Sequence, residues 1–330
     1  MIEVPWFEDF SVGDDFSDVP SITITEGMTA IHQAMFGDRQ QLTLDQELSC
    51  AVTGESRGLV NTSLVCNLAI GQTTIASQRV MGNLFYRGLV LRNPVFVGDT
   101  LTTSTKVVGL RQNKIKPGRP SSGMVALEIH TTNQNGDTVL HFWRCPMIPC
   151  KDSEIDTGQA DDFSLMPEDI ADANLIDSIP NWNFSAFNTT ASCIIVGATI
   201  DVEPRDTVTM APELVRLTQN LAMTHTDAGR SVYGKRLVYG GHTISIAAAQ
   251  LGRAFPNLVG VLAWYHCDHT APVFEQDILY SRCTPEKVES VNGVQLVRLH
   301  VETYADRGSE APTSDSEVKV LDWSLAALVV

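Results

Sequence analysis

The chain has 330 residues, of which 43% are hydrophobic and 19% are charged, and its formal net charge is −16. This length suits two domains of ordinary size, and the composition predicts a well-packed globular protein and not a disordered one. The negative charge disfavours nucleic-acid binding, which needs Lys and Arg to replace phosphate counterions, although a local basic cluster can still bind an anionic ligand.

The N-terminus and the cysteines predict a cytoplasmic protein. Residues 1–9 carry early acidic residues and no apolar segment of the signal-peptide kind. No apolar run reaches the ~18 residues that span a bilayer, so no membrane partner is expected. The seven cysteines include no Cys-x-x-Cys pair and no zinc-type spacing. We therefore expect buried free thiols in a reducing compartment and no metal site.

The first part of the chain predicts two helices followed by strands. Apolar residues recur at helical spacing over 26–36 and again over 64–70. The sequence Arg-Asn-Pro-Val-Phe-Val-Gly-Asp-Thr-Leu follows at 92–101, and a hairpin turn is predicted at 133–137. The strands predicted from alternating apolar residues lie at 101–110, 123–132 and 138–148.

An acidic segment divides the chain into nearly equal halves. Residues 151–177 include nine acidic residues and one basic residue, Lys151. A stretch of this composition cannot bury much apolar surface, so we predict a solvated linker at the surface. The domains expected on either side of it are 1–150 and 178–330.

The second part of the chain repeats this order of elements. Helical spacing returns over 213–223 and 243–251. The sequence Thr-Ala-Pro-Val-Phe-Glu-Gln-Asp-Ile-Leu at 270–279 resembles that of 92–101, and an Asn-Gly turn is predicted at 291–294. The strands predicted after it lie at about 278–290, 294–304 and 316–323.

The spacing between the two copies is nearly constant, which indicates a duplicated domain. Pro94 and Pro272 are 178 residues apart, and Asp38 and Asn220 are 182 residues apart. Helices followed by a run of antiparallel strands predict an α+β fold in each half, with a helix packed on a curled sheet.

The sequence resembles the MaoC-like (R)-specific enoyl-CoA hydratases, which adopt the hotdog fold. The family signature is a Gly-Asp pair, a His five positions after the Asp, and a later Gly at the start of the central helix. The sequence Pro-Val-Phe-x-Gly-Asp-Thr-Leu is also typical of the family. The resemblance implies a double hotdog, with each central helix wrapped by a curled antiparallel sheet. It also implies that Asp and His handle the catalytic water, while the Gly amide binds the thioester oxygen.

Neither half contains the complete Asp/His pair of this signature. In the first half Gly37-Asp38 matches, but Thr43 stands at the His position. In the second half His225 is present, but Asn220 stands at the Asp position. We therefore expect a degenerate first half that supplies an acyl-CoA groove, and a second half that carries the hydratase motif.

The second half is similar to the mesaconyl-CoA hydratase (2-methylmalyl-CoA dehydratase) branch of the family. The stretches that carry this resemblance are Gln219-Asn-Leu-Ala-Met-Thr-His225 and Tyr233-Gly-Lys-Arg-Leu-Val-Tyr-Gly-Gly-His242. The branch also keeps Gly-Asp-Arg without the His in its first half, as at residues 37–39 here. The resemblance implies reversible hydration of a short, branched enoyl-CoA that carries a second carboxylate.

His225 and the pair Gly240-Gly241 fit the chemistry that hydration requires. A group with a pKa near neutrality must take a proton from water and return one to carbon, which suits histidine. Glycines at a loop-to-helix junction can present bare amides to the thioester oxygen, where enolate charge develops. A structural histidine and a simple tight turn are the alternative interpretations.

Asn220, His242 and Asp38 each allow two interpretations. Asn220 is either a site residue or an amide satisfied in the core or at a helix cap. His242 either touches the ligand or packs under the helix, and Asp38 either forms a secondary site or fixes its own loop. If the substrate has its own carboxylate, an Asn at position 220 avoids repulsion between two carboxylates in a dry site. His266 and His269 have a spacing that fits no metal motif.

Arg230, Lys235 and Arg236 form a basic cluster between His225 and the glycine pair. These residues are candidates for binding a substrate carboxylate or a coenzyme A phosphate, because arginine pairs with such groups in a bidentate manner. Arg236, next to the glycine pair, is the preferred candidate. A solvated loop face is the alternative, and it is favoured for Arg230.

We therefore expect a hydro-lyase that uses no cofactor beyond the coenzyme A of its substrate, with a homodimer of double hotdogs as one assembly. A hotdog acyl-CoA thioesterase is an alternative, but it would need an acidic residue on the central helix, and 243–250 contains none. A non-catalytic acyl-CoA-binding protein is a second alternative, which the retention of His225 with the glycine pair disfavours. No glycine-rich dinucleotide loop is present.

Overall fold

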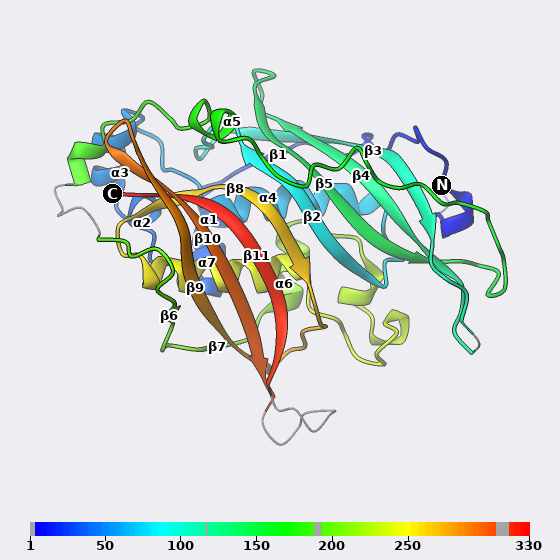
Figure 1. The fold of residues 1–330 in the computed structure, drawn as a ribbon. Coiled ribbons are helices and arrows are strands. Elements are labelled where there is room, and N and C mark those ends of the chain that lie inside the picture. The colour runs from blue at the N-terminus through cyan, green and yellow to red at the C-terminus, as the bar shows by residue number, and fades with distance from the viewer. Residues whose placement is uncertain (1–3, 117, 188–192, 308–316) are drawn as a thin grey trace.

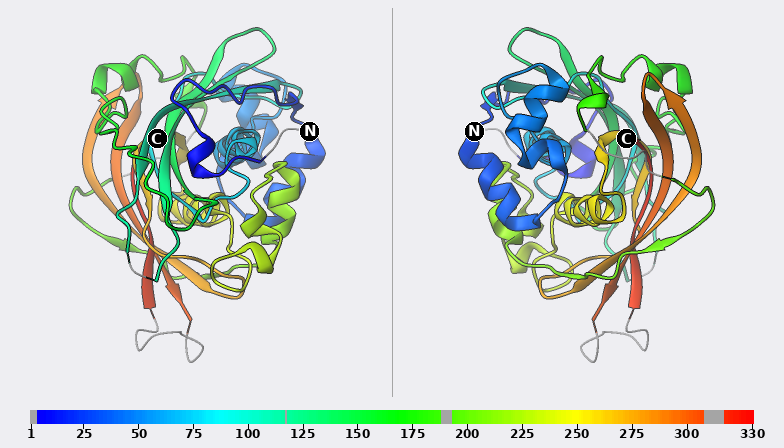
Figure 2. Two further views of the ribbon diagram at one scale, coloured as in Figure 1. Left: turned by 90° about the vertical axis from the view of Figure 1, so that its right-hand side faces the viewer. Right: turned by 90° about the vertical axis from the view of Figure 1, so that its left-hand side faces the viewer.

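The computed structural model of the chain describes residues 4–116, 118–187, 193–307 and 317–330. Eleven strands form one antiparallel sheet that curls around two helices (Figures 1 and 2). No helix in these residues is long and apolar enough to cross a membrane.

The strands of the two halves mirror each other across the middle of this sheet. The first half has the order β1-β3-β4-β5-β2, and the second continues as β8-β11-β10-β9-β6, with β7 also paired to β9. The strands of the first half are β1 (Ile22–Thr23), β2 (Gly82–Leu91), β3 (Thr100–Gln112), β4 (Ser122–Thr132) and β5 (Thr138–Pro149). Those of the second half are β6 (Ile200–Asp201), β7 (Asp206–Thr207), β8 (Leu258–His269), β9 (Ile278–Val291), β10 (Val294–Asp306) and β11 (Glu317–Val329). Because β2 pairs with β8, one sheet runs through both halves.

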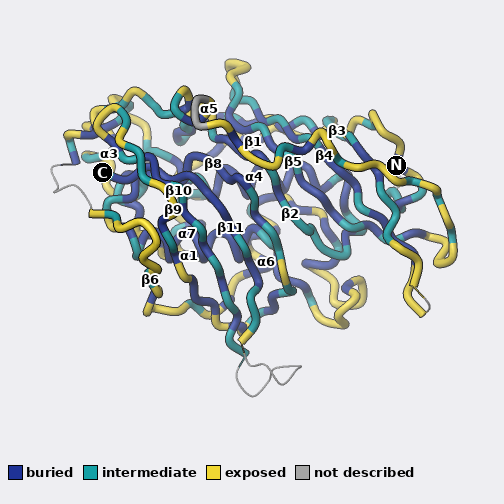
Figure 3. Tube along the Cα trace, viewed as in Figure 1, coloured by how far each residue is buried: buried dark blue, intermediate teal, exposed yellow. Residues whose placement is uncertain are grey.

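One helix from each half, α4 (Thr62–Gln72) or α7 (Gly240–Ala254), lies inside the curl of the sheet (Figure 2). Residues 63–72 of α4 are all buried, as expected of a helix enclosed on every side (Figure 3). Where the two helices meet, Asn67 Nδ2 donates to Ser245 Oγ at 2.8 Å. The remaining helices are α1 (Glu26–Phe36), α2 (Gln41–Leu44), α3 (Gln46–Thr53), α5 (Asp172–Ile176) and α6 (Ala211–Leu217).

Repeated hydrogen bonds show the duplication at the level of single atoms. The N–H of Phe96 donates to Asp99 Oδ2 at 2.8 Å, and the N–H of Phe274 donates to Asp277 Oδ2 at 2.9 Å. These two aspartates are 178 residues apart, as are the two phenylalanines. Each aspartate therefore closes the same turn before β3 or β9, and the α+β double-hotdog expectation fits this architecture.

Most of the elements predicted from periodicity are confirmed. The helix predicted over 26–36 is α1, and those predicted over 64–70 and 243–251 are the cores of α4 and α7. All six predicted strands are present, and the predicted hairpin turns join β4 to β5 and β9 to β10. At the second of these turns Asn292 and Gly293 both have positive φ, at 51° and 83°, as a tight Asn-Gly hairpin requires.

The helix predicted over 213–223 is wrong beyond Leu217. The Thr218 hydroxyl donates back to the carbonyl of Leu214 at 2.8 Å, and Gln219 adopts a left-handed φ of 54°. Backbone in that conformation cannot continue an α-helix, so the chain turns there. The turn matters for function because it carries the next residues into a cavity.

Five of the described strands lie outside the predicted set: the two-residue strands β1, β6 and β7, and the long strands β2 and β8. The two long ones matter most. Both are central in the sheet, and most of β8 is buried on both faces, so its apolar residues run on without alternation. Such a run cannot be distinguished from a buried helix by periodicity alone. The pairing of β2 with β8, which joins the two halves, therefore could not be predicted from the alternation of apolar residues.

The acidic segment lies at the surface, as predicted, but it buries three apolar side chains that its composition alone does not predict. Most of its residues are exposed, but Met166, Ile170 and Leu175 are buried against the outer face of the sheet (Figure 3). Glu168 and Asp169, between the first two of them, are exposed, so a few apolar side chains attach the segment to the sheet. The domain boundaries at 150 and 178 stay a prediction.

All seven cysteines are free thiols. Five of them are buried, as predicted, whereas Cys50 and Cys193 are exposed, so the expectation of burial is wrong for these two. Burial raises the pKa of the Cys145 thiol to about 12, which makes it an inert packing group.

Candidate active site

A cavity of about 240 Å³ lies between the two halves, beside the N-terminus of α7. The first half contributes the turn after α4, the start of β2 and part of β5. The second half contributes the loop after α6, the start of α7 and the segment after β8. The polar side chains that line the cavity include Ser77, Tyr86, Arg144, Asn220, His225, Tyr239 and His269.

The turn after α6 places Asn220 in the cavity wall. Its backbone N–H donates to the carbonyl of Val215 at 2.9 Å, and its side-chain Oδ1 accepts from the N–H of Ala222 at 2.9 Å. Because only an oxygen can accept from that N–H, the amide Nδ2 faces the other way. This Nδ2 is buried and has no partner among the described residues. Asn220 thus offers an unused donor to a ligand.

His225 follows on a 3-10 turn, Met223–His225, and is 9% exposed. Its Nδ1 lies 2.8 Å from the carbonyl oxygen of Leu237, which can only accept, so Nδ1 carries the proton. Nε2 is then the unprotonated nitrogen, free to accept a proton from water. Burial lowers the pKa of His225 to about 4, with the Leu237 hydrogen bond opposing the shift. The imidazole is therefore neutral at physiological pH, as a general base must be.

The N-terminus of α7 reaches the same cavity through Gly240. The first N–H groups of a helix have no acceptor within the helix, and the N-cap residue Tyr239 provides no side-chain cap. A side chain at Gly240 would collide with the ring of His269, and one at Gly241 would collide with Asn67. Gly240 lines the cavity, whereas Gly241 packs against Asn67 and Tyr239 outside the lining, and the oxyanion role of the pair stays a prediction that favours Gly240.

Arg144, on β5, is the cavity residue that sequence reasoning missed most clearly. It is 3% exposed, and its Nη2 donates to Ser77 Oγ. Burial lowers the pKa of its guanidinium, which nevertheless stays charged in proteins. Alternation in the predicted strand already placed Arg144 on the same inward face as Phe142. A charged residue at such a position was the available signal.

His269, at the end of β8, is a second residue that sequence reasoning did not assign to the site. Burial lowers its pKa to about 4, and its Nε2 has no partner among the described residues. Its ring makes an edge contact with Tyr86 at 6.0 Å between centroids. Two neutral histidines therefore face one cavity, and His269 was missed because β8 was not predicted.

The predicted basic cluster lies outside this cavity. Arg230 and Lys235 are exposed, and Lys235 Nζ sits 3.6 Å from the centre of the Phe274 ring. Arg236 is partly exposed and forms an ion pair with Glu275. A role for these residues in binding substrate or coenzyme A stays a prediction. They would bind such a group on the outer side of the loop and not inside the cavity.

His242 packs under the helix, which is the second of the two interpretations given for it. Its Nε2 lies 2.7 Å from the carbonyl oxygen of Thr209, and its ring contacts Phe36 at 4.9 Å between centroids. It does not belong to the cavity lining.

Asp38 lies at the mirror position of Asn220, in the other half, and not beside His225. Its Oδ1 accepts from the N–H of Gln40 at 3.0 Å, which is the same turn that Asn220 makes. Its Oδ2 accepts from Asn61 Nδ2 at 2.7 Å. Burial raises the pKa of Asp38, and these hydrogen bonds oppose the shift. The structure therefore favours the loop-fixing interpretation, with both carboxylate oxygens already used.

A mirror cavity does exist beside α4, but its volume is only about 40 Å³. The longer side chain of Gln40 lines it at the position equivalent to Ala222 in the first cavity, and Leu91 lies at the position equivalent to His269. Asn61 caps α4 by accepting from the N–H of Ser63 at 2.9 Å, so the helix end is closed.

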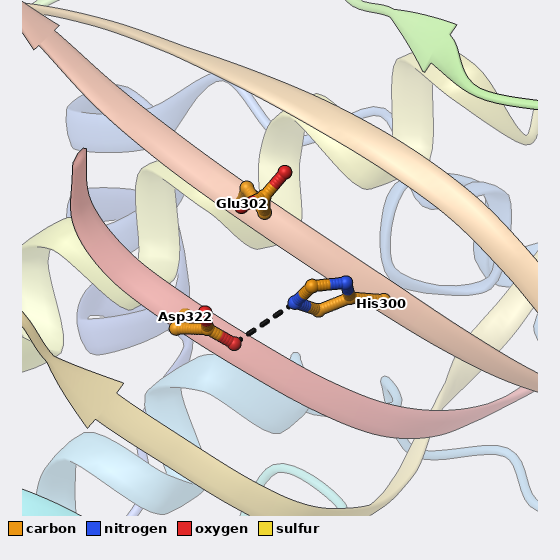
Figure 4. A group of neighbouring side chains, drawn as sticks. All are labelled: His300, Glu302 and Asp322. Atoms are coloured by element: carbon orange, nitrogen blue, oxygen red, sulfur yellow. Dashed lines mark hydrogen bonds and ion pairs between the residues drawn. The ribbon is translucent and has the colours of Figure 1, made fainter.

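One further group of side chains could hold a metal ion, and it lies on the outer face of the sheet, away from the cavity. The group consists of His300, Glu302 and Asp322 on β10 and β11 (Figure 4). Lys319 Nζ lies 3.0 Å from Glu302 and 2.7 Å from Asp322, and His300 lies 2.9 Å from Asp322. The acidic charges are thus already paired, and we interpret the group as a surface ion-pair network.

Comparison with known proteins gives two curated relatives, while no family model matches the chain. The beta-methylmalyl-CoA dehydratase of Chloroflexus aurantiacus is 30% identical over 299 residues, which cover 84% of this chain and 80% of the relative. The mesaconyl-CoA hydratase of Cereibacter sphaeroides is 27% identical over 315 residues, which cover 90% of this chain and 88% of the relative.

Two solved structures share the fold over its whole length. A conserved Mycobacterium tuberculosis protein, described as a double hotdog, is 41% identical with a TM-score of 0.88, covering 99% of this chain and 98% of that one. A putative MaoC domain dehydratase from Chloroflexus aurantiacus is 26% identical with a TM-score of 0.80, covering 100% of this chain and 99% of that one. The predicted double hotdog is thereby confirmed.

Proposed function

This chain is a hydro-lyase of the MaoC-like hydratase and dehydratase family, and we propose that its substrate is a short, branched enoyl-CoA with a second carboxylate, of the mesaconyl-CoA kind. The relatives named for hydration or dehydration of such thioesters support the reaction class. The volume of about 240 Å³, roughly that of eight water molecules in the liquid, supports a short acyl group.

One observation carries the proposal: His225, with Nδ1 fixed by Leu237, lines the same cavity as the uncapped amide of Gly240. In hydration, Nε2 of His225 takes a proton from water while the water oxygen bonds to the β-carbon. The electron pair of the double bond moves toward the thioester oxygen, where the Gly240 N–H stabilises the enolate. The α-carbon then takes the proton back from Nε2, which gives addition on one face. No oxidation or reduction of the enzyme is needed, so the step uses no redox cofactor.

Asn220 supports a substrate with its own carboxylate. Its free Nδ2 can donate to such a group, while an Asp at the same place would repel it in a site with little water. The second lone pair of Oδ1 remains available to orient the attacking water.

A thioesterase remains the competing reaction on this fold. Enzymes of that kind attack with a carboxylate on or near the central helix. None of the described residues that line the cavity is acidic, which favours hydration over hydrolysis.

The test is an absorbance assay that follows loss of the enoyl-thioester chromophore with crotonyl-CoA, mesaconyl-CoA and itaconyl-CoA. We expect turnover, with the highest kcat/KM for mesaconyl-CoA. Release of free coenzyme A without loss of the double bond would instead identify a thioesterase, and no reaction with any thioester would reject the proposal.

A further inference from the structure

Arg144 is a buried cation that has no anionic partner in the described part of the chain. Its Nη2 donates to a hydroxyl, that of Ser77, and its Nε has no partner among the described residues. No described carboxylate forms an ion pair with it. An isolated charge in a protein interior is costly, and a guanidinium cannot escape the cost by losing its proton. Such a residue is therefore retained at the expense of stability.

Two partly buried arginines of this chain do have carboxylate partners. Arg307, with an 11% exposed side chain, pairs with Asp277 at 3.2 Å. Arg253, with an 18% exposed side chain, pairs with Asp206 at 2.7 Å. Arg144 is more deeply buried than either and departs from this pattern.

The cavity around Arg144 has the electrostatic character of an anion site. The chain as a whole carries a net charge of −16, yet none of the described cavity-lining residues is acidic. Asn220 Nδ2 is a second donor without a described partner in the same lining. A cationic group and an unused amide donor together can satisfy the two oxygens of a carboxylate.

The other half of the molecule indicates that the fold itself does not need this arginine. Arg144 pairs with Tyr86 across β5 and β2, while the mirror strands β11 and β8 pair Leu325 with Trp264. Leu325 is completely buried and belongs to the hydrophobic core. The same strand position thus accepts a neutral side chain in the other copy of the fold.

We propose that Arg144 binds the acyl carboxylate of the substrate and thereby selects dicarboxylic over monocarboxylic acyl-CoA thioesters. This inference rests on the acyl-CoA chemistry proposed above for the same cavity. The carboxylate supplies the anion that Arg144 lacks, and an acyl group that ends in a methyl leaves the guanidinium buried and unpaired. Discrimination comes as much from that penalty as from the new ion pair.

Binding of the carboxylate would also strengthen the base. Burial is the main cause of the low pKa of His225, and the positive charge of Arg144 lowers it further. When a bound carboxylate neutralises Arg144, this second contribution disappears and the pKa of His225 rises. A dicarboxylic substrate would therefore activate the group that hydrates it.

The experiment compares wild type with Arg144→Leu, Arg144→Gln and Arg144→Lys. Kinetics are measured with mesaconyl-CoA and crotonyl-CoA, and affinities with the saturated analogues methylsuccinyl-CoA and butyryl-CoA. We expect Arg144→Leu and Arg144→Gln to lose about 10²- to 10³-fold in kcat/KM for mesaconyl-CoA, the range for truncating one partner of a buried charge pair, and little for crotonyl-CoA. Arg144→Lys should keep part of the preference. Arg216→Leu, which removes the same charge from a 73% exposed side chain, is the control and should behave like wild type.

The two analogues separate this inference from the proposed function, because they bind without reacting. Wild type should bind methylsuccinyl-CoA at least 10-fold more tightly than butyryl-CoA, and the neutral variants should lose that difference. If wild type shows this preference but hydrates no thioester, the proposed function fails and the inference stands. If the neutral variants weaken both analogues equally, or keep the preference, the inference is overturned. If Arg144→Leu does not fold, the ratio of the affinities for methylsuccinyl-CoA and butyryl-CoA in Arg144→Gln and Arg144→Lys tests the inference.

Discussion

The cavity beside His225 and its mirror beside Gln40 occupy equivalent places in two copies of one fold, and they differ in volume, about 240 Å³ against about 40 Å³. In the first, the helix end is open, and the polar lining includes Arg144, Asn220 and two histidines but no described acidic residue. In the second, Asn61 closes the helix end and the side chain of Gln40 lines the smaller space. A homodimer of single domains would have two identical sites, whereas a fused duplication allows each to change alone.

The comparison also explains why the acid of the signature survives in the half without the histidine. Asp38 has become part of a closed hydrogen-bond network with Asn61 and Gln40. Asn220 Nδ2 has no partner among the residues that the structure describes, and Asn220 lines the cavity. We therefore interpret the carboxylate as structural in one half and propose the amide as a ligand group in the other.

Substitution of His225, the residue that most distinguishes the two cavities, should have the largest effect on kcat. His225→Ala should lower kcat by about 10²-fold or more, the usual range for a general acid–base group, because Nε2 no longer moves the proton. Thr43→Ala, at the mirror position, should leave kcat unchanged. The measurement is turnover of mesaconyl-CoA, with circular dichroism to verify folding. Near-normal turnover in His225→Ala would move the reaction to another site.

The open helix end provides a second test of the comparison. Gly240→Ala should lower kcat by about 10²-fold, because its methyl group would press on the His269 ring and displace the amide from the thioester oxygen. Thr62→Ala, at the start of α4, should have little effect on kcat. Equal effects of the two substitutions would mean that the start of α7 has no special role.

The Asn/Asp exchange sharpens the comparison further. Asn220→Asp should shift the ratio of kcat/KM by about 10-fold toward crotonyl-CoA, because the new carboxylate repels that of mesaconyl-CoA. Asn220→Ala should impair both substrates. Asp38→Asn should leave both values unchanged and reduce thermal stability, since it removes an acceptor from Asn61. A gain of activity on mesaconyl-CoA in Asn220→Asp would contradict this account of the amide.

The smallest effect concerns the pH dependence of folding. His269 binds a proton in the unfolded chain below about pH 6.5, but in the folded protein only below about pH 4. Between these values the unfolded state binds more protons, so the free energy of unfolding falls as pH falls from 6.5 to 4. His269→Leu, which installs the residue of the mirror cavity, should reduce that slope by at most about 1.4 kcal/mol per pH unit. Urea titrations at pH 7.5, 6 and 5 measure it, and an unchanged slope would contradict the burial of a neutral His269.

The sequence predicted the duplication and most of the elements because repeated motifs and alternation are local signals. It could not predict the junction between the halves, since β8 is buried on both faces and shows little alternation. That junction determines which residues meet, and so Arg144 and His269 were missed. The basic cluster around Arg236 was a candidate because it is close in sequence to the glycine pair. Arg236, however, forms an ion pair with Glu275, and periodicity cannot predict such a contact between segments.

The central claim is that the chain has one working acyl-CoA site and one closed mirror site. Calorimetric titration of the wild-type protein with methylsuccinyl-CoA tests it most directly, because the ligand binds without turnover and the stoichiometry counts the sites. The account predicts one thioester bound per chain. Two thioesters bound per chain would contradict it, because the mirror cavity would then be open to ligand.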